Sequence, residues 1–222
     1  MDTTKKSAII LGATGLTGGI LLQKLLLDER YASIKLFSRS KVGIDHPKLE
    51  EHLGNLFELE HFKNQFKADE VYCCIGTTKS KTPEKEVYRK IDYGIPVKTA
   101  KLCSQNGIPT LIVISALGAS ARSSVFYNRI KGEMEEAVLE AGIPKTHLLE
   151  PSLIGGQREE KRTGEWVAKQ LFKVVDLFLV GPLKKYRSIH PETIAKAMIW
   201  VANNTYPKTR IPTDEIVKIA NN

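Results

Sequence analysis

The chain has 222 residues, a formal net charge of +8 and a pI near 9.3. This length suffices for one well-buried α/β domain. The basic residues are scattered, with no helix-turn-helix pattern and no basic groove with interleaved aromatic residues, so we expect no nucleic-acid partner. No apolar stretch approaches the roughly 20 residues that cross a bilayer.

The first residues and the cysteines narrow the class of protein further. No apolar signal core follows the N-terminus, so we expect a cytoplasmic protein. The three cysteines show neither a disulfide framework nor metal-ligand spacing, so we predict free thiols and no metal site.

Strand and helix patterns alternate along the chain, which predicts a Rossmann-type, doubly wound parallel sheet. We expect a single domain over residues 1–222, in which about 151–222 form a small C-terminal substrate or lid segment. The predicted strands are 8–11, 34–38, 49–53, 70–75, 110–115 and 146–149. The predicted helices are 17–27, 59–66, 84–106, 124–141, 165–179, 191–203 and 214–220.

Three glycines spaced three apart stand between the first strand and the first helix. Glycine permits backbone angles closed to other residues, and the unpaired N–H groups of a helix N-terminus suit a diphosphate. Glycines that serve only turn and packing are the alternative, but this placement favours a dinucleotide. The expected contacts are Gly12, Thr14, Gly15, Leu16, Thr17 and Gly18.

The residues after the second strand indicate which dinucleotide is bound. A protein that prefers NAD usually has a carboxylate here for the ribose hydroxyls. This chain instead has Ser38 and Arg39, and an arginine fork pairs well with a phosphate. We therefore predict NADP(H), with Arg39 on the 2′-phosphate and Ser38 or Ser40 assisting; the alternative is a solvated basic loop.

Two later loops also follow predicted strands. Asn55 and Leu56 are placed to meet the adenine, and Gly76, Thr77 and Thr78 to meet the ribose and diphosphate. Ordinary turns are the alternative for both loops.

Ser115, Tyr127 and Lys131 are the candidate catalytic residues. Tyr127 and Lys131 lie four apart on a predicted helix and so share one face. A nearby cation moves a tyrosine pKa toward working pH, and we expect the Ser115 hydroxyl to face the same cleft and hydrogen-bond a substrate carbonyl. Tyr31 and Lys35 have the same spacing but lie around the second strand, where they share no helical face. The alternative for Tyr127 and Lys131 is an amphipathic helix with a solvated lysine.

These residues resemble the short-chain dehydrogenase/reductase superfamily, and the glycine spacing is similar to that of its extended and atypical branches. Tyr-x-x-x-Lys-Gly-Glu at 127–133 and Pro-Ser-Leu-Ile-Gly-Gly-x-Arg at 151–158 resemble one atypical group, the NADPH-binding oxidoreductases similar to the Tat-interacting tumour-suppressor protein. The resemblance covers essentially the whole chain. It implies proton-relay roles for Ser115, Tyr127 and Lys131, and a place beside the nicotinamide for Pro151 to Ile154, including Leu153.

The chain departs from the superfamily at Asp92, where the main branch often has an asparagine. We expect an NADP(H)-dependent oxidoreductase acting on a small carbonyl or alcohol. The alternative is an NADP(H)-binding regulatory protein with little activity, which contacts a protein partner through the apolar segment 171–180. A nucleotide-sugar epimerase is less favoured because the region after Leu153 is short.

Overall fold

The structure is a computed structural model that describes residues 5–155 and 187–222. Seven parallel strands form one sheet in the order β3-β2-β1-β4-β5-β6-β7. The strands are β1 (Lys6–Leu11), β2 (Tyr31–Ser38), β3 (Leu49–Leu53), β4 (Glu70–Cys73), β5 (Thr110–Ile114), β6 (Lys145–Glu150) and β7 (Arg210–Pro212). The predicted doubly wound Rossmann-type fold is confirmed.

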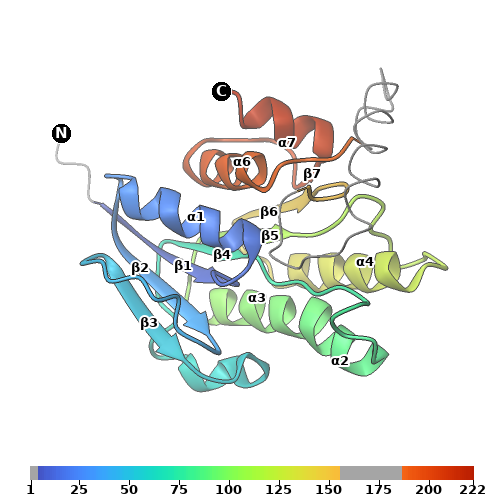
Figure 1. Ribbon diagram of the computed structural model, residues 1–222, viewed down its shortest axis with the longest axis horizontal. Helices are drawn as coiled ribbons and strands as arrows, with labels where there is room; N and C mark the ends of the chain where they lie inside the picture. The colour runs from blue at the N-terminus through green and yellow to red at the C-terminus, as the bar shows by residue number, and fades with distance from the viewer. Residues whose placement is uncertain (1–4, 156–186) are drawn as a thin grey trace, which may run out of the picture.

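Helices cover both faces of the sheet (Figure 1). One face carries α1 (Leu16–Leu27), α6 (Pro191–Asn203) and α7 (Thr213–Ile219). The other carries the 3₁₀ helix η1 (Leu56–Phe62), α2 (Lys85–Arg89), the π-helical turn η2 (Lys90–Gly94), α3 (Ile95–Gln105) and α4 (Phe126–Leu139).

Each face has its own apolar core, and the strands supply both cores by alternation. Ile10 of β1 packs toward α1 and α6, whereas Ile9 and Leu11 pack toward α3 and α4. Cys73 and Cys74 likewise lie on opposite faces.

The predicted helix 84–106 is interrupted in the structure. Ile95 donates its N–H to the Lys90 carbonyl five residues back, which makes the π turn η2. Pro96 follows and has no N–H to give to the carbonyl four residues before it, so the regular helical ladder cannot run through this point. Such π turns often occur at functional sites.

Other differences concern element ends and short elements. β7 was not predicted because three residues are too few for an alternation pattern. The predicted helix 59–66 is instead the 3₁₀ helix η1, which starts where Asn55 accepts the Phe57 N–H. The predicted helix 165–179 and the apolar segment 171–180 lie outside the described residues.

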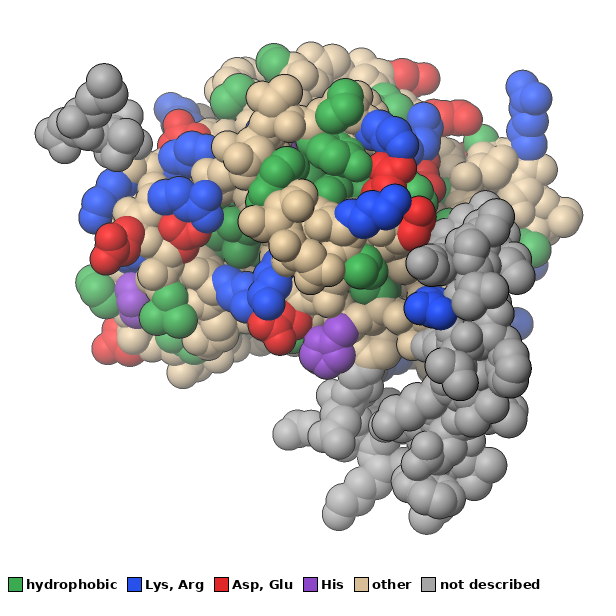
Figure 2. Space-filling model, turned by 90° about the horizontal axis from the view of Figure 1, so that it is seen from above, with side chains coloured by type: hydrophobic (Ala, Val, Ile, Leu, Met, Phe, Trp, Pro, Cys, Tyr) green, Lys and Arg blue, Asp and Glu red, His purple; other side chains and the backbone are tan. Residues whose placement is uncertain are grey.

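The surface agrees with the scattered basic residues of the sequence. On the face seen in Figure 2, Lys and Arg side chains stand among acidic, apolar and polar ones rather than in one patch. Within the described part of the chain, no helix is both long and apolar enough to cross a membrane.

Candidate active site

The glycine turn is closed by contacts that leave no room for side chains. Gly12 has φ of +87°, and a Cβ there would lie 2.8 Å from the Cys74 carbonyl oxygen. A Cβ at Gly18 would lie 2.2 Å from the Gly12 carbonyl oxygen, and the Gly15 N–H donates to that same oxygen at 2.9 Å. The turn therefore presents bare backbone at the N-terminus of α1, which suits a diphosphate.

A cavity of about 1010 Å³ opens beside this turn. Three segments line it, and each follows the carboxyl end of a strand, where ligands of doubly wound sheets bind. They are the β1–α1 turn with α1, the loop after β2 and the loop after β4. The lining residues include Thr14, Gly15, Leu16, Ser40, Lys41, Gly76, Thr77, Thr78 and Lys81.

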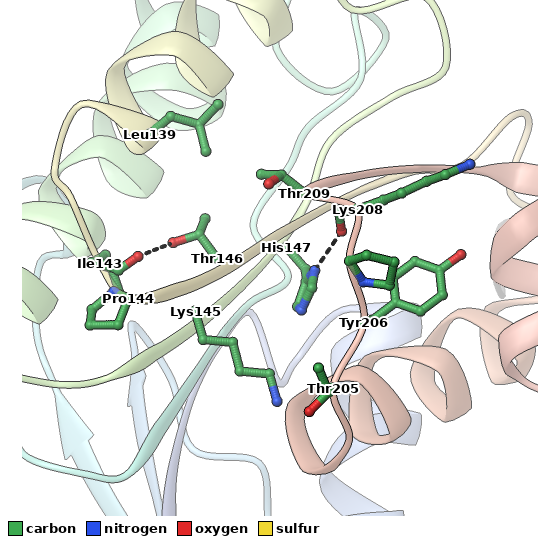
Figure 3. Close-up of a pocket in the computed structure, with 11 residues that line it drawn as sticks. Leu139, Ile143, Pro144, Lys145, Thr146, His147, Thr205, Tyr206, Lys208 and Thr209 are labelled. Carbon is green, nitrogen blue, oxygen red and sulfur yellow. Dashed lines mark hydrogen bonds between the residues drawn. The ribbon is translucent and has the colours of Figure 1, made fainter.

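A smaller cavity of about 370 Å³ lies at the opposite edge of the sheet (Figure 3). It is lined by the start of β6 and by residues 205–209, and His147 Nδ1 lies 2.9 Å from the Lys208 carbonyl oxygen. Because this cavity is far from the carboxyl ends of the strands, we assign the candidate site to the larger one.

The structure rearranges the expected contacts at the adenosine end of the cavity. Ser38 is buried and its hydroxyl donates to the Ser40 carbonyl at 2.7 Å, so it supports the loop from within. Arg39 is exposed and does not line the cavity, whereas Lys41 does. Lys41 is a further ammonium of this basic stretch, two residues after Arg39, and it was not among the predicted cofactor contacts.

Two residues predicted to meet the adenine have structural contacts instead. Asn55 is exposed and caps η1 through its side-chain oxygen, 3.0 Å from the Phe57 nitrogen. Leu56 is buried in the core among α3 and α4, and its contact with the cofactor stays a prediction. Thr17 of the glycine turn is also buried.

Tyr127 and Lys131 lie one turn apart on α4, as the spacing predicted. The Tyr127 side chain is 39% exposed, whereas Lys131 is 3% exposed and donates to the Ile114 carbonyl at 3.4 Å. A Cβ at Gly132 would lie 2.1 Å from the Ser120 carbonyl carbon. Glycine therefore lets α4 pack directly against residues 120–121. This packing sets the position of Tyr127 and Lys131 relative to the sheet.

Asp92 is the partner of Lys131. Asp92 Oδ1 lies 3.0 Å from Lys131 Nζ, and Asp92 Oδ2 accepts the Thr77 N–H at 2.8 Å. A Cβ at Gly76 would lie 3.4 Å from Asp92 Oδ1 and 3.8 Å from Lys131 Nζ. The ion pair therefore lies against residues 76–77, which line the cavity, and it joins this part of the cavity wall to α4.

The charges of this pair set the ionisation of the site. Burial would lower the pKa of Lys131, but the charges of Asp92 and Tyr127 raise it above its ordinary value. Burial also raises the pKa of Tyr127, and Asp92 offsets the lowering effect of Lys131, so the Tyr127 pKa is higher than usual. Lys131 lowers the Tyr127 pKa, as its charge predicts, but burial and Asp92 together outweigh this effect.

Ser115 is positioned differently from the prediction. It is 3% exposed, and its hydroxyl donates to Glu135 Oε1 on α4 rather than facing the cleft. Glu135 Oε2 accepts Arg210 Nε of β7 at 2.7 Å, and Glu150 Oε1 lies 3.9 Å from the same nitrogen. Burial and the neighbouring Glu135 raise the pKa of Glu150 to about 7.

The segment predicted to lie beside the nicotinamide starts at the end of β6. Pro151 is buried and its carbonyl accepts the Leu117 N–H at 2.9 Å, whereas Leu153 is 57% exposed. Residues 156–158 of the predicted motif lie outside the described residues, so their place at the site stays a prediction.

The chain resembles curated proteins over most of its length. The HTATIP2 protein of Rattus norvegicus is 29% identical over 171 residues, which cover 75% of this chain and 70% of that protein. The FMP52 protein of Meyerozyma guilliermondii is 30% identical over 199 residues, 88% of this chain and 84% of that protein. No protein-family model matches the chain.

A solved structure shares the fold at low sequence identity. MoeE5 in complex with UDP-glucose and NAD superposes with a TM-score of 0.66 at 15% identity, covering 96% of this chain and 80% of that one. This likeness supports the Rossmann architecture.

The relatives correct one expectation. The FMP52 proteins of Meyerozyma guilliermondii, Candida albicans and Debaryomyces hansenii are named mitochondrial, so the expected cytoplasmic location is wrong by this comparison. The sequence similarity indicates the same family as the glycine turn and the shared face of Tyr127 and Lys131. The chain belongs to the family of the FMP52 and HTATIP2 proteins, an atypical branch of the short-chain dehydrogenase/reductase superfamily.

Proposed function

We propose that the protein is an NADP(H)-dependent oxidoreductase that interconverts a small carbonyl compound and its alcohol. The observation that carries this proposal is the half-exposed Tyr127 beside the buried Lys131, at the carboxyl edge of a sheet with a glycine-lined cavity. A tyrosine hydroxyl that a ligand can reach, next to a fixed positive charge, is suited to general acid–base catalysis.

The residues in and around the cavity suit a dinucleotide. The Gly12–Gly18 turn offers backbone N–H groups to a diphosphate, with close approaches that a Cβ would block. Lys41 lines the cavity two residues after Arg39, and Asp and Glu are absent from positions 38–42. We propose that Lys41 and Arg39 together attract the 2′-phosphate, which favours NADP(H).

The chemistry then divides between cofactor and protein. A bound nicotinamide supplies the hydride. Tyr127 gives its hydroxyl proton to the carbonyl oxygen and recovers it from solvent, while Lys131 stabilises the phenolate in between. Ser115 is left out of this proton transfer, because its one proton is donated to Glu135.

Binding measurements test the cofactor assignment. Calorimetry would compare NADPH with NADH for the wild type, Arg39→Ala, Lys41→Ala and the control Lys101→Ala, which removes an exposed lysine of α3. A charge-assisted hydrogen bond contributes about 1.5–3 kcal/mol, so the first two changes should weaken NADPH about tenfold or more and leave NADH unchanged. Equal affinities of the wild type for the two cofactors would contradict the 2′-phosphate assignment.

Turnover tests the reaction. We expect Tyr127→Phe to reduce the rate with a panel of small carbonyl compounds by about 10²–10⁴-fold while NADPH still binds. A second candidate function, an NADP(H)-binding regulatory protein, is favoured by the neutralisation of Lys131 by Asp92. NADPH binding with no turnover by the wild type across the panel would support this second function and contradict the first.

A further inference from the structure

The Asp92–Lys131 pair is an uncommon feature because both charges are almost fully buried. Asp92 is 1% exposed and Lys131 is 3% exposed, with 3.0 Å between Oδ1 and Nζ. Burying a charge is costly unless it is paired, so the two opposite charges compensate each other. The carboxylate comes from the π turn η2 and the ammonium from α4, so the pair also fixes two elements relative to each other.

Asp92 is held from two sides. Its second oxygen accepts the backbone N–H of Thr77 at 2.8 Å. The π turn adds one residue to this turn of the helix, so Asp92 would lie at a different position in a regular helix. Among the described residues, Oδ1 has no hydrogen bond of good geometry and faces the ammonium alone. The carboxylate is thus committed to Lys131.

The groups that face Tyr127 come from three elements. Lys131 lies one turn along α4, Asp92 approaches from η2, and Tyr88 of α2 places its ring 6.4 Å from the Tyr127 ring. Cys73 of β4 lies near the Lys131 ammonium. Burial is the largest cause that opposes the release of a proton by Tyr127, and Asp92, the one carboxylate in this set, is the charge that adds to it.

We propose that Asp92 is a positioning residue that keeps the Tyr127–Lys131 pair fully protonated at neutral pH. This inference rests on the proposed function, in which Tyr127 is the proton donor. Without the carboxylate, a desolvated ammonium and a phenol share one site with no negative charge, and the first of their two protons leaves at lower pH. With it, Tyr127 keeps its proton until a carbonyl oxygen takes it, so the site is arranged for reduction.

The test measures the two ionisations directly, in protein without substrate. NMR titration of ¹³C-labelled lysine and tyrosine would follow Lys131 and Tyr127, assigned with Lys131→Met and Tyr127→Phe. In the wild type, both midpoints should lie above their ordinary values. In Asp92→Asn, which keeps an acceptor for Thr77, the first midpoint of the pair should fall by about one to three pH units. The control Glu136→Gln, an exposed change on the same helix, should leave both midpoints unchanged.

Two outcomes would overturn the inference. One is a wild-type midpoint below the ordinary value for Tyr127 or Lys131, which needs no variant and so holds even if Asp92→Asn does not fold. The other is a folded Asp92→Asn protein with the wild-type midpoints. A lowered midpoint without any carbonyl turnover by the wild type would contradict the proposed reductase and leave the ionisation inference standing.

Discussion

A tyrosine, a carboxylate and a lysine meet at both edges of the sheet, and the two sets are built differently. At the amino edge, Glu70 accepts the hydroxyls of Tyr31 at 2.6 Å and Tyr72 at 2.7 Å, and its other oxygen accepts Lys6 Nζ at 2.7 Å. Tyr31 is 0% exposed, and Asn203 of α6 also donates to its hydroxyl. Every polar atom named here has a partner, and no tyrosine hydroxyl reaches solvent.

At the carboxyl edge, the carboxylate contacts the lysine rather than the tyrosine. Asp92 pairs with Lys131, and the Tyr127 hydroxyl makes no hydrogen bond with any described residue. Tyr127 is 39% exposed, so it is the one of these tyrosines that a molecule from solvent can contact. Burial, together with the charge and hydrogen bond of Glu70, raises the pKa of Tyr31 far above its ordinary value, which removes it from acid–base chemistry.

The comparison shows what distinguishes a structural set from a candidate catalytic one. Residue types do not, because both edges have the same three. Spacing does not either, because Tyr31 and Lys35 repeat the spacing of Tyr127 and Lys131. The two sets differ in whether the tyrosine hydroxyl has hydrogen-bond partners among the described residues. Each of the following substitutions tests one of the two sets.

The largest effect should come from Glu70→Ala. The change leaves the Lys6 ammonium and two buried tyrosine hydroxyls without their shared acceptor, and breaking such a network typically costs about 3–5 kcal/mol. Urea denaturation should show this loss, with NADPH affinity of the folded protein unchanged. Glu29→Gln is the control, since changing this exposed carboxylate should cost less than about 1 kcal/mol. Equal losses in the two variants would show that the amino-edge network is not a major source of stability.

Glu150 should make stability depend on pH, because its pKa is raised from 4.5 to about 7 in the folded protein. A raised pKa means that the folded state holds the proton more tightly than the unfolded state. The stabilisation that protonated Glu150 contributes is therefore complete below about pH 4.5 and is lost as the pH rises through about 7. The total loss is about 3 kcal/mol at most. Glu150→Gln should remove this loss and unfold at higher urea than the wild type at pH 8.

The comparison that matters for Glu150 is between two pH values. At pH 4.5 the wild type and Glu150→Gln should be similarly stable, because Glu150 is protonated in the folded wild type. A variant equally stabilised at pH 4.5 and pH 8 would mean that the effect comes from packing and not from ionisation.

The sequence predicted the features that depend on neighbours in the chain. The glycine turn is local, and the shared face of Tyr127 and Lys131 follows from helical spacing. The fold followed from alternating strand and helix patterns, although β7 was too short to detect. The same spacing rule extends to Glu135, eight residues after Tyr127, so this residue could have been found from the sequence.

The contacts between distant residues could not be read in this way. Asp92 attracted attention as a departure from a family pattern, but its distance from Lys131 depends on the π turn and on how α4 packs through Gly132. Arg210 meets Glu135 across 75 positions of the chain. Strand alternation places Ser115 on the same face of the sheet as Val113, facing α4, which explains why its hydroxyl meets Glu135.

Ser115→Ala gives the smallest expected loss of stability. It tests whether Ser115 and Tyr127 belong to one network at the carboxyl edge or to two. The change removes a hydrogen-bond donor from buried Glu135, which still has Arg210, so we expect a loss of about 1–3 kcal/mol in urea denaturation. Because the hydroxyl donates its proton to Glu135, kcat should fall less than about tenfold, against about 10²–10⁴-fold for Tyr127→Phe. If Ser115 instead orients the substrate, kcat will fall with Ser115→Ala nearly as far as with Tyr127→Phe while stability barely changes. That result would show that Ser115 acts together with Tyr127. Substrate binding would then replace the hydrogen bond between Ser115 and Glu135.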